Sequence, residues 1–342
     1  MNILLITPAG RRSLAGNRAT ATRWAGFLRK AGHRVRIATD FDGQPADALI
    51  ALHAWRSAEA IEQFRRLCPE TPRVVVLTGT DIYRFQHSHP EPTLASMEVA
   101  DVLVGLHECV GDDIPAHFRQ RLRVVLQSAQ PLPSGNAQSP VRRHFDICVV
   151  GHLREEKDSL RAAKAVRELP QDSRLRVVQV GRAHDVAWET AAQAETQQNR
   201  RFVWRGEVPH WRVRRLMGQV RAMVMSSRME GGANAVAEAC AAGLPVIASD
   251  ISGNVGMLGK DYAGYYPVGD TVGLREMLLQ AERSPAFLGE LKAHCTARAE
   301  LFTPEREARG VLAALEQACR CADARRRGAA ESWSTVRLDR AY

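Results

Sequence analysis

The sequence lacks several features that would place the protein in other classes. No apolar run approaches the roughly 20 residues that cross a bilayer, and the first strand-like segment, MNILLITPAG, has no basic leader before it. We therefore expect a cytoplasmic protein. Aromatic residues make up only 6% of the chain, few of them are interleaved with arginines, and no nucleic-acid-binding module is recognisable. We expect no nucleic-acid partner.

Metal and disulfide frameworks are also missing. The seven cysteines are odd in number and scattered, and Cys319 and Cys321 have no second Cys/His pair at zinc spacing. We expect reduced thiols, no metal and no cofactor. The G-x-G-x-x-G motif is absent as well, so a dinucleotide site is weakly supported.

The length and charge of the chain are informative. A chain of 342 residues is too long for one typical core and suits two domains. Its net charge is +9, and nearly all of its 47 basic residues are arginines. Such a balance attracts nucleic acid, acidic membranes or phosphorylated substrates, although an arginine-favouring composition explains it equally well.

The stretch MSSRMEGGANAVAEACAAGLPVIASD, Met225–Asp250, is the most informative part of the chain. It predicts a buried strand that ends near Met225, a glycine-containing turn, and a helix from about Asn234 to Ala242. A glycine stop and a second buried strand, Pro245–Ala248, follow. This is a strand–helix unit followed by its next strand.

The junction between strand and helix carries the chemistry. Glycines in the turn let the backbone approach a ligand, and the N–H groups that open the helix suit an anion such as a diphosphate. Glu230 stands before this helix and Glu238 lies in its second turn. Carboxylates accept hydrogen bonds from hydroxyl-rich groups such as a sugar ring and a ribose. The spacing predicts a nucleotide-sugar site whose amides come from Gly231, Gly232, Ala233, Asn234 and Ala235.

A second candidate anion site lies near the N-terminus. Asn2–Thr7 reads as a strand, residues 8–16 (PAGRRSLAG) as a loop, and Asn17–Ala31 as a helix. The loop follows the carboxyl end of the first strand, where open α/β sheets bind ligands. Arg11 and Arg12 lie in it, and guanidinium groups offer bidentate contacts to phosphate. A basic surface loop is the alternative.

Polar residues also end other strands of the first domain. Strand Arg73–Leu77 runs directly into a polar turn that contains Asp81, a candidate base or hydrogen-bond acceptor. His107 and His53 each follow a strand, where an imidazole can orient or deprotonate an acceptor. Histidines at such places are nevertheless more often structural.

The central stretch resembles the C-terminal half of GT-B glycosyltransferases, in particular the large family 4. Two glutamates eight residues apart across a glycine-rich turn, followed by A-x-G-x-P-V-I-A, carry the resemblance. It implies an α/β fold of two Rossmann-like doubly wound domains that face each other across a cleft. It also implies that Glu238 holds the nucleotide ribose, that Glu230 faces the donor sugar, and that the turn amides hold the diphosphate.

The resemblance extends to other loops. Family 4 has G-R-L-x-x-E-K-G where this chain has GHLREEKD, so Lys157 matches the lysine that neutralises the departing diphosphate. His152 occupies the arginine position, with Arg154 two residues on, and the replacing cation stays open. The backbone near Val208 corresponds to the contact with the base. The N-terminal loop would face an anionic acceptor through Gly10, Arg11, Arg12, Asn17 and Arg18.

The pattern also predicts the domain boundaries. We expect an acceptor-side domain at residues 1–133, a Pro- and Ser-rich linker at 134–141, and a UDP-sugar-binding domain at 142–304. A crossover helix at 305–321, as in other GT-B proteins, would return to the first domain. Residues 322–342 have no convincing pattern and are expected to form a basic tail.

A narrower resemblance covers nearly the whole chain up to about residue 320. The segments GNRATATRWAGFLRKAGHRV, ALHAWRSAEAI, LTGTDIY and SSRMEGGANAVAEACAAGLPVIASDISGNVGMLG resemble the selenosugar synthase branch of family 4, which serves selenoneine biosynthesis. This implies transfer from UDP-N-acetylglucosamine or UDP-glucose to selenophosphate, with a new C–Se bond. Selenophosphate is already ionised, so Thr80 and the arginines would position it without a strong base. No stable membrane association is expected.

Three other functions also fit the sequence. A family 4 enzyme acting on a lipid or saccharide hydroxyl would need Asp81 or His107 as its base. A UDP-sugar epimerase would share the fold and use water as second reactant. A non-catalytic nucleotide-sugar binding protein would have a degraded site, whereas Glu230, Lys157 and Glu238 are all present.

Overall fold

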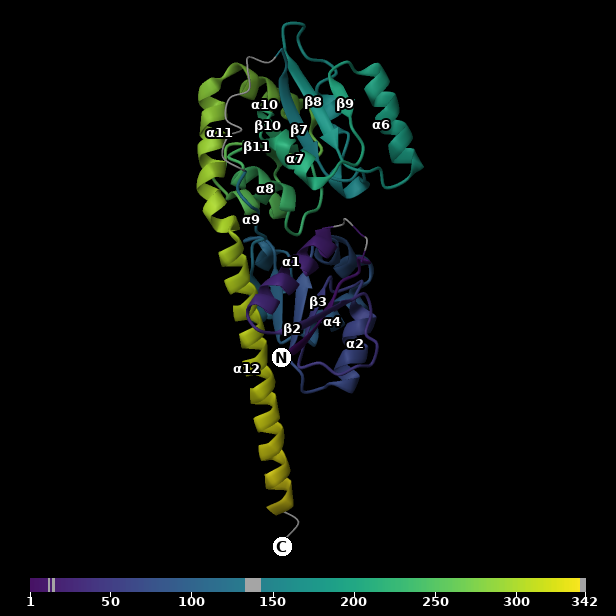
Figure 1. The fold of residues 1–342 in the computed structure, drawn as a ribbon, viewed down its shortest axis with the longest axis vertical. Coiled ribbons are helices and arrows are strands. Elements are labelled where there is room, and N and C mark those ends of the chain that lie inside the picture. The colour runs from purple at the N-terminus through teal and green to yellow at the C-terminus, as the bar shows by residue number, and fades with distance from the viewer. Residues whose placement is uncertain (12, 14–15, 133–142, 339–342) are drawn as a thin grey trace. The chain divides into compact units, whose positions relative to one another are not determined.

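The computed structural model describes residues 1–11, 13, 16–132 and 143–338. The chain divides into two compact units, unit 1 (Met1–Leu126 and Glu305–Tyr342) and unit 2 (Gln127–Pro304) (Figure 1). The predicted linker 134–141 lies outside the described residues. The change of unit falls before it, because the amide of Ala129 donates to the carbonyl of Phe302 at 2.9 Å and ties this segment to unit 2.

Unit 1 contains a parallel sheet in the order β2-β1-β3-β4-β5-β6. Apolar residues on β1 pair in register with both neighbours, as Ile3 does with Val35 and with Ala48. The strands, within the described residues, are β1 Asn2–Ile6, β2 Arg34–Ala38, β3 Ala48–Leu52, β4 Arg73–Leu77, β5 Val102–Gly105 and β6 Leu122–Val124.

Helices cover both faces of this sheet. Trp24 and Leu28 of α1 pack on one face and Ile61 and Phe64 of α2 on the other, in two separate cores. The α-helices of this part are α1 Gly16–Lys30, α2 Ala58–Leu67, α3 Gln86–Ser88 and α4 Pro90–Glu98, with a π-helical turn at Asp81–Phe85. The sequence predicted that the second helix begins at Trp55, but an irregular turn delays it to Ala58.

The C-terminal helix α12 spans Pro304–Leu338 and completes unit 1 (Figure 1). Val311, Ala314, Leu315 and Ala318 are buried in the same core as Trp24. The helix therefore extends past residue 321, where the crossover helix was expected to end, and includes the expected basic tail as far as Leu338. Alanine and arginine make up eight of residues 322–338, and their high helix propensity lets the helix continue.

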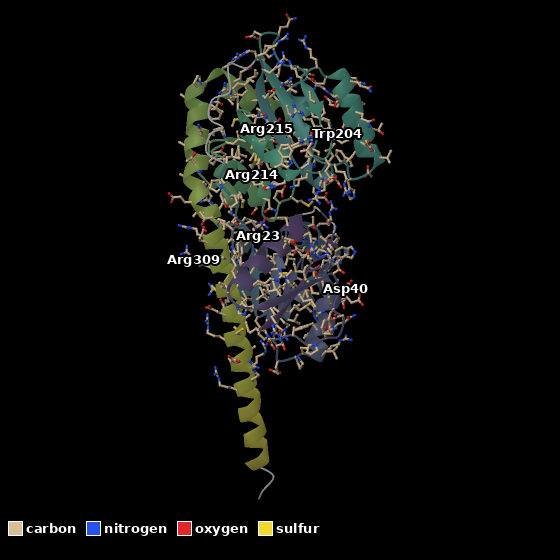
Figure 2. The ribbon with its side chains drawn as sticks, in the orientation of Figure 1. Arg23, Asp40, Trp204, Arg214, Arg215 and Arg309 are labelled. Carbon is tan, nitrogen blue, oxygen red and sulfur yellow. The ribbon has the colours of Figure 1, made fainter. Side chains whose placement is uncertain are left out.

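One buried ion pair fixes α12 to α1. The Glu307 carboxylate is 1% exposed and accepts hydrogen bonds from Arg23 Nε at 2.6 Å and from Trp24 Nε1 at 2.7 Å. Arg23 is labelled in Figure 2. A buried carboxylate without such partners would be strongly destabilising, so this contact fixes the position of the helix along unit 1.

Unit 2 contains a second parallel sheet, in the order β12-β11-β10-β7-β8-β9. Counted within unit 2, this is the Rossmann order 3-2-1-4-5-6, which reverses direction between β7 and β10. The described strands are β7 Phe145–Val150, β8 Leu175–Val180, β9 Phe202–Trp204, β10 Ala222–Met225, β11 Val246–Ser249 and β12 Tyr265–Tyr266.

The α-helices of unit 2 alternate with its strands. They are, in the part of the chain that the structure describes, α5 Arg161–Ala165, α6 Val186–Gln198, α7 His210–Met217, α8 Asn234–Ala241, α9 Ser252–Leu258, α10 Thr271–Arg283 and α11 Pro285–Arg298. Within the same described residues, no helix is both long and apolar enough to span a membrane.

Candidate functional site

The two most informative loops of unit 2 meet at the point where its strand order reverses. One follows β7 and contains Lys157 in a single 3-10 turn, and the other follows β10 and contains Glu230. The Lys157 ammonium donates a hydrogen bond to Oε1 of Glu230. Open α/β sheets bind ligands in the crevice outside the strand ends at such a reversal. The structure therefore brings these two predicted site residues together where a ligand is expected.

A chain of buried hydrogen bonds holds Glu230 in place. Glu230 is only 7% exposed. Ser227 Oγ donates a hydrogen bond at 2.5 Å to Oε1 of Glu230, the atom that also accepts from Lys157. Ser249 Oγ in turn donates to the Ser227 carbonyl at 2.6 Å, and Asn254 Nδ2 donates to Ser249 Oγ at 3.0 Å. Buried networks of this kind rigidify a site when their members are satisfied. The sequence reading did not identify Ser227, Ser249 or Asn254.

Gly253 explains how α9 can approach Glu230. A Cβ atom at this position would lie 2.1 Å from the Glu230 carbonyl oxygen, far inside any normal contact. Only glycine allows the first turn of α9 to pack this closely. The backbone of Glu230 is thus held by a helix as well as by its side-chain network.

Helix α8 begins directly after the glycine turn at Gly231 and Gly232. Its N-cap residue, Ala233, supplies no side-chain cap, so the amides of the first turn are not satisfied by that residue and suit an anion. The turn residues Gly231, Ala233, Asn234 and Ala235 lie where the sequence predicted them, at the carboxyl end of β10.

Glu238 lies one turn into α8 and has a partner that the sequence reading missed. Its Oε1 is 3.0 Å from His210 Nε2, at the start of α7. This hydrogen bond raises the pKa of His210. Protonated His210 therefore neutralises Glu238 below that pKa. The only signal in the sequence was the position of His210 directly after Pro209, a common start for a helix.

His152 does not act as the cation that its place in the pattern suggested. Its Nδ1 accepts a hydrogen bond from the Arg182 amide at 3.1 Å, and burial lowers its pKa. The ring is therefore neutral near pH 7. The positive charges of this loop come from Lys157 and from Arg154, whose Nε lies 3.8 Å from Glu156 Oε2.

Asp158 occupies the glycine position of the family pattern. Its backbone adopts a left-handed conformation, with φ 44° and ψ 49°, which explains why glycine is the usual residue there. The Asp158 carboxylate accepts from Arg161 Nε at 2.8 Å, and its carbonyl accepts from Ser226 Oγ at 3.2 Å. These bonds compensate for the strain and close the loop that presents Lys157.

Three glycines line the strand ends beside this loop. Gly151, Gly181 and Gly206 follow β7, β8 and β9, and all three have positive φ. A Cβ atom on Gly181 would lie 1.9 Å from the Gly151 carbonyl oxygen. The indole Nε1 of Trp204, labelled in Figure 2, donates to the Gly181 carbonyl at 2.9 Å. The backbone path of the Lys157 loop thus depends on close contact with Gly181.

Val208 lies in the half-buried loop between β9 and α7. Within the described residues, its backbone amide makes no hydrogen bond, so it is available for the base contact that the resemblance implies. Also within these residues, no group of three or more His, Cys, Asp and Glu side chains could hold a metal ion.

The polar groups of unit 1 gather at strand ends, as predicted, but two of them are fully buried. The Asp81 carboxylate accepts from the amides of Ala54, Thr78 and Gly79 at 3.1, 2.9 and 2.7 Å. This geometry clamps two loops together, so it favours a structural role over that of a base.

His107 is 0% exposed, and burial lowers its pKa to about 4. Its Nε2 is 2.8 Å from the hydroxyl of Tyr83, which donates to Asp113 at 2.9 Å. A neutral histidine that supports Tyr83 in the interior cannot meet an acceptor in solvent. The prediction of a catalytic His107 therefore finds no support in its surroundings.

His53 is also buried, at 2% exposed, and it pairs with the half-buried Thr80. His53 Nδ1 accepts from the Arg56 amide at 3.2 Å, which leaves Nε2–H to donate to Thr80 Oγ1 at 2.9 Å. Burial lowers the pKa of His53, which agrees with this neutral form. His53 also has φ 75°, and strained backbone of this kind is concentrated at functional sites.

The basic loop follows β1, at the reversal of strand order in unit 1. Arg11 is exposed and Asn17 and Arg18 are half-buried, while the Ser13 amide donates to the Gly10 carbonyl at 3.0 Å. Arg12 lies outside the described residues. Among the residues that are described, no carboxylate pairs with Arg11 or Arg18, so both guanidinium groups can bind an anion.

Comparisons with known proteins agree with this architecture. Residues 137–281, less than half of the chain, match the family model of glycosyl transferases group 1. The structure of Anabaena HepE in complex with UDP has a TM-score of 0.73 at 14% identity and covers 92% of this chain and 100% of its own.

Two further solved structures are similar over most of the chain. Sucrose-phosphate synthase from Thermosynechococcus elongatus has a TM-score of 0.71 at 16% identity, covering 90% of this chain and 96% of its own. The lipopolysaccharide outer core galactosyltransferase WaaB, in its apo form, has a TM-score of 0.68 at 15% identity, covering 92% of this chain and 99% of its own. At such identities the likeness shows the fold, which is GT-B, as the sequence predicted.

Proposed function

We propose that the protein is a glycosyltransferase that takes its sugar from a UDP-sugar bound by unit 2. The observation that carries the proposal is the constellation at the reversal of strand order. There Glu230 is paired with Lys157, and Glu238 is paired with His210 beside the amides of α8. This constellation lies wholly within the segment that matches glycosyl transferases group 1. Structures of Anabaena HepE contain UDP and UDP-glucose.

Each group has a defined part in donor binding. Glu238 accepts hydrogen bonds from the ribose hydroxyls, and Glu230 faces the sugar. Lys157 and the α8 amides surround the diphosphate, whose negative charge grows as the bond to the sugar breaks. Prearranged cations and amides stabilise such charge without reorganisation. Because Lys157 and the α8 amides supply the positive charge that balances the diphosphate, we expect activity to persist when divalent metals are chelated.

We propose selenophosphate as the acceptor, with UDP-N-acetylglucosamine or UDP-glucose as donor. Four segments resemble the selenosugar synthase branch, and the surroundings of the unit 1 side chains support an acceptor that needs no base. Asp81 and His107 are both 0% exposed, and His53 is neutral because burial lowers its pKa. A hydroxyl acceptor needs a group that removes its proton. Selenophosphate is already ionised, and Arg11 and Arg18 offer it cations.

The proposed reaction balances without an oxidant. The selenium lone pair of selenophosphate forms a bond to the anomeric carbon, and the bond from that carbon to the UDP oxygen breaks, with its electrons leaving on UDP. Water then cleaves the P–Se bond, which gives phosphate and the selenosugar.

Mass spectrometry of reactions with each UDP-sugar tests the proposal. Parallel tubes contain selenophosphate, thiophosphate, phosphate, a saccharide or lipid with free hydroxyl groups, or no acceptor. A product with the selenium isotope pattern, together with UDP, is expected only with selenophosphate. A product that forms with a saccharide or lipid hydroxyl, and not with selenophosphate, would leave the UDP-sugar assignment standing and overturn the acceptor.

Matched variants separate the donor from the acceptor. Arg11→Gln and Arg18→Gln should raise KM for selenophosphate and leave the Kd for UDP unchanged, because both residues belong to unit 1. Arg29→Gln, on the same helix as Arg18, is the control. It removes the same charge from the far end of α1, where Arg29 bonds to the Val35 carbonyl.

A further inference from the structure

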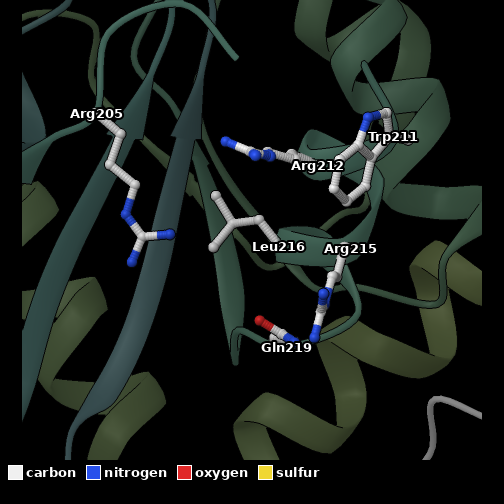
Figure 3. A pocket seen from close by; sticks show the side chains of 6 residues that line it. All are labelled: Arg205, Trp211, Arg212, Arg215, Leu216 and Gln219. Atoms are coloured by element: carbon white, nitrogen blue, oxygen red, sulfur yellow. The ribbon is translucent and has the colours of Figure 1, made fainter. Parts of the chain in front are cut away.

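A cavity of about 370 Å³ lies in unit 2 against α7, outside the donor site (Figure 3). Its residues come from the end of β9, from α7 and from the turn that follows α7. They are Arg205, Trp211, Arg212, Arg215, Leu216 and Gln219. The volume lies within the range of sites that hold small molecules.

The cavity concentrates positive charge without a protein counter-ion. Three of its six lining residues are arginines and none is acidic. Among the described residues, no carboxylate pairs with the guanidinium groups of Arg205, Arg212 or Arg215. Other arginines of the unit are paired, as Arg176 is with Asp146 at 2.7 Å. Three like charges around one cavity repel one another, and a bound anion relieves that repulsion.

Helix geometry separates this cavity from the donor site. His210 and Arg214 lie one turn apart on α7, His210 contacts Glu238, and Arg214 donates to the Pro131 carbonyl at 2.6 Å. With about 100° per residue, the cavity residues of α7 project from the opposite side of the helix. Arg214 and its neighbour Arg215 are both labelled in Figure 2. The cavity is thus a distinct site on a helix that also contacts the donor site.

The remaining walls favour a ligand with a carbon skeleton. Trp211 is 58% exposed, although its ring is large and apolar, and Leu216 lies buried at the back of the cavity. The Arg212 guanidinium lies 5.1 Å from the centre of the Trp211 ring, which orders both side chains. Gln219 adds a neutral donor and acceptor.

We propose that this cavity binds a small phosphorylated molecule. Its phosphate is held by the guanidinium groups of Arg205, Arg212 and Arg215, and its carbon skeleton packs against Trp211 and Leu216. Arginine suits this role because its planar fork matches phosphate oxygens. The cavity has a volume of about 370 Å³ and an apolar wall formed by Trp211 and Leu216, and these features favour a free phosphate ester over a membrane surface.

The test follows the indole N–H signal of Trp211 in NMR spectra of the full chain. The six tryptophans give separate indole signals, and Trp211→Phe identifies the one concerned. Glucose 6-phosphate is titrated with saturating UDP present, so that the donor site is already occupied. We expect a saturable shift of the Trp211 signal, and no shift with glucose.

A control variant on the same helix removes charge outside the cavity. Because each charge-assisted hydrogen bond contributes measurably, Arg212→Gln with Arg215→Gln should weaken binding about tenfold or more. Arg214→Gln removes one charge from the other side of the same helix and should leave binding within about twofold. Glu238→Ala should weaken UDP binding yet leave the response to glucose 6-phosphate, so failure of the proposed function is distinguishable from failure of this site.

Three results would overturn the proposal. One is the absence of any shift up to about 10 mM ligand, beyond the weak end of specific affinities. Another is an equal shift in the double variant and the unchanged protein. The third is a shift with vesicles of phosphatidic acid but not with glucose 6-phosphate, because that result would assign the arginines to a membrane surface.

Discussion

Gly181→Ala places a single methyl group against the backbone of the loop that presents Lys157. The new Cβ would lie 1.9 Å from the Gly151 carbonyl oxygen and 2.9 Å from the His152 amide nitrogen. Ordinary contacts begin near 3.4 Å, so the loop must move by about 1.5 Å, and a displacement of about 1 Å at a catalytic group can cost about 100-fold in rate. We therefore expect kcat/KM of Gly181→Ala, measured by UDP release, to fall by about 100-fold or more.

The control must carry the same kind of backbone penalty without the clash. Gly206→Ala does so, because Gly206 has φ 64° and nothing within 4 Å of its missing Cβ. Its stability should fall by about 1 kcal/mol, measured by thermal unfolding, with kcat/KM nearly unchanged. Equal activity in the two alanine variants would refute the reasoning.

A milder change covers the case in which Gly181→Ala does not fold. Trp204→Phe removes the 2.9 Å hydrogen bond to the Gly181 carbonyl and adds no atoms. We expect a two- to tenfold loss of kcat/KM, roughly the value of one hydrogen bond. Unchanged kinetics in this variant would show that the position of Gly181 does not matter to the Lys157 loop.

Three other predictions concern charge. Lys157→Met should lower kcat by about 100-fold or more, whereas Lys164→Met, at an exposed position of α5, should not; equal rates would remove Lys157 from the mechanism. His107→Ala should lower the melting temperature and leave kcat/KM nearly unchanged, and a folded but inactive variant would restore His107 as a base. The hydrogen bond to Glu238 raises the pKa of His210, so their ion pair forms below that pKa and is lost as pH rises through it. The ribose hydroxyls of UDP compete with His210 for Glu238, so UDP should bind more tightly as pH rises from about 6 to 8. Calorimetry should show that UDP binding releases protons. A pH-independent Kd for UDP, or the same pH dependence in His210→Gln, would contradict this prediction.

Much of the fold was predictable from local patterns. The strand Arg73–Leu77 has the predicted bounds, because continuous apolar runs between polar turns are typical of buried parallel strands. The helix predicted at Asn234 begins there, because the glycines before it mark the turn. The GT-B prediction rested on the resemblance of the stretch around Glu230 and Glu238 to family 4, and it was confirmed by the two parallel sheets and the similar solved structures.

The surroundings of several predicted site residues were not predictable, because they depend on burial and on partners distant in the sequence. His107 and Asp81 stand at the predicted strand ends, but a sequence does not show that 0% of either is exposed. The neutral state of His152 depends on its desolvation and on the Arg182 amide. Helix α7 was not predicted because arginines interrupt its apolar periodicity, and the His210 contact was missed with it.

The return of α12 to unit 1 has a consequence for synthesis. The core around Trp24 is closed by Val311, Ala314, Leu315 and Ala318, which leave the ribosome after all of unit 2. Domains usually fold in the order in which they are made, but here the unit translated first is completed last. The first 126 residues must therefore wait, with an apolar face uncovered, while unit 2 is synthesised. A nascent chain halted before residue 304 would present that face to chaperones and to other chains.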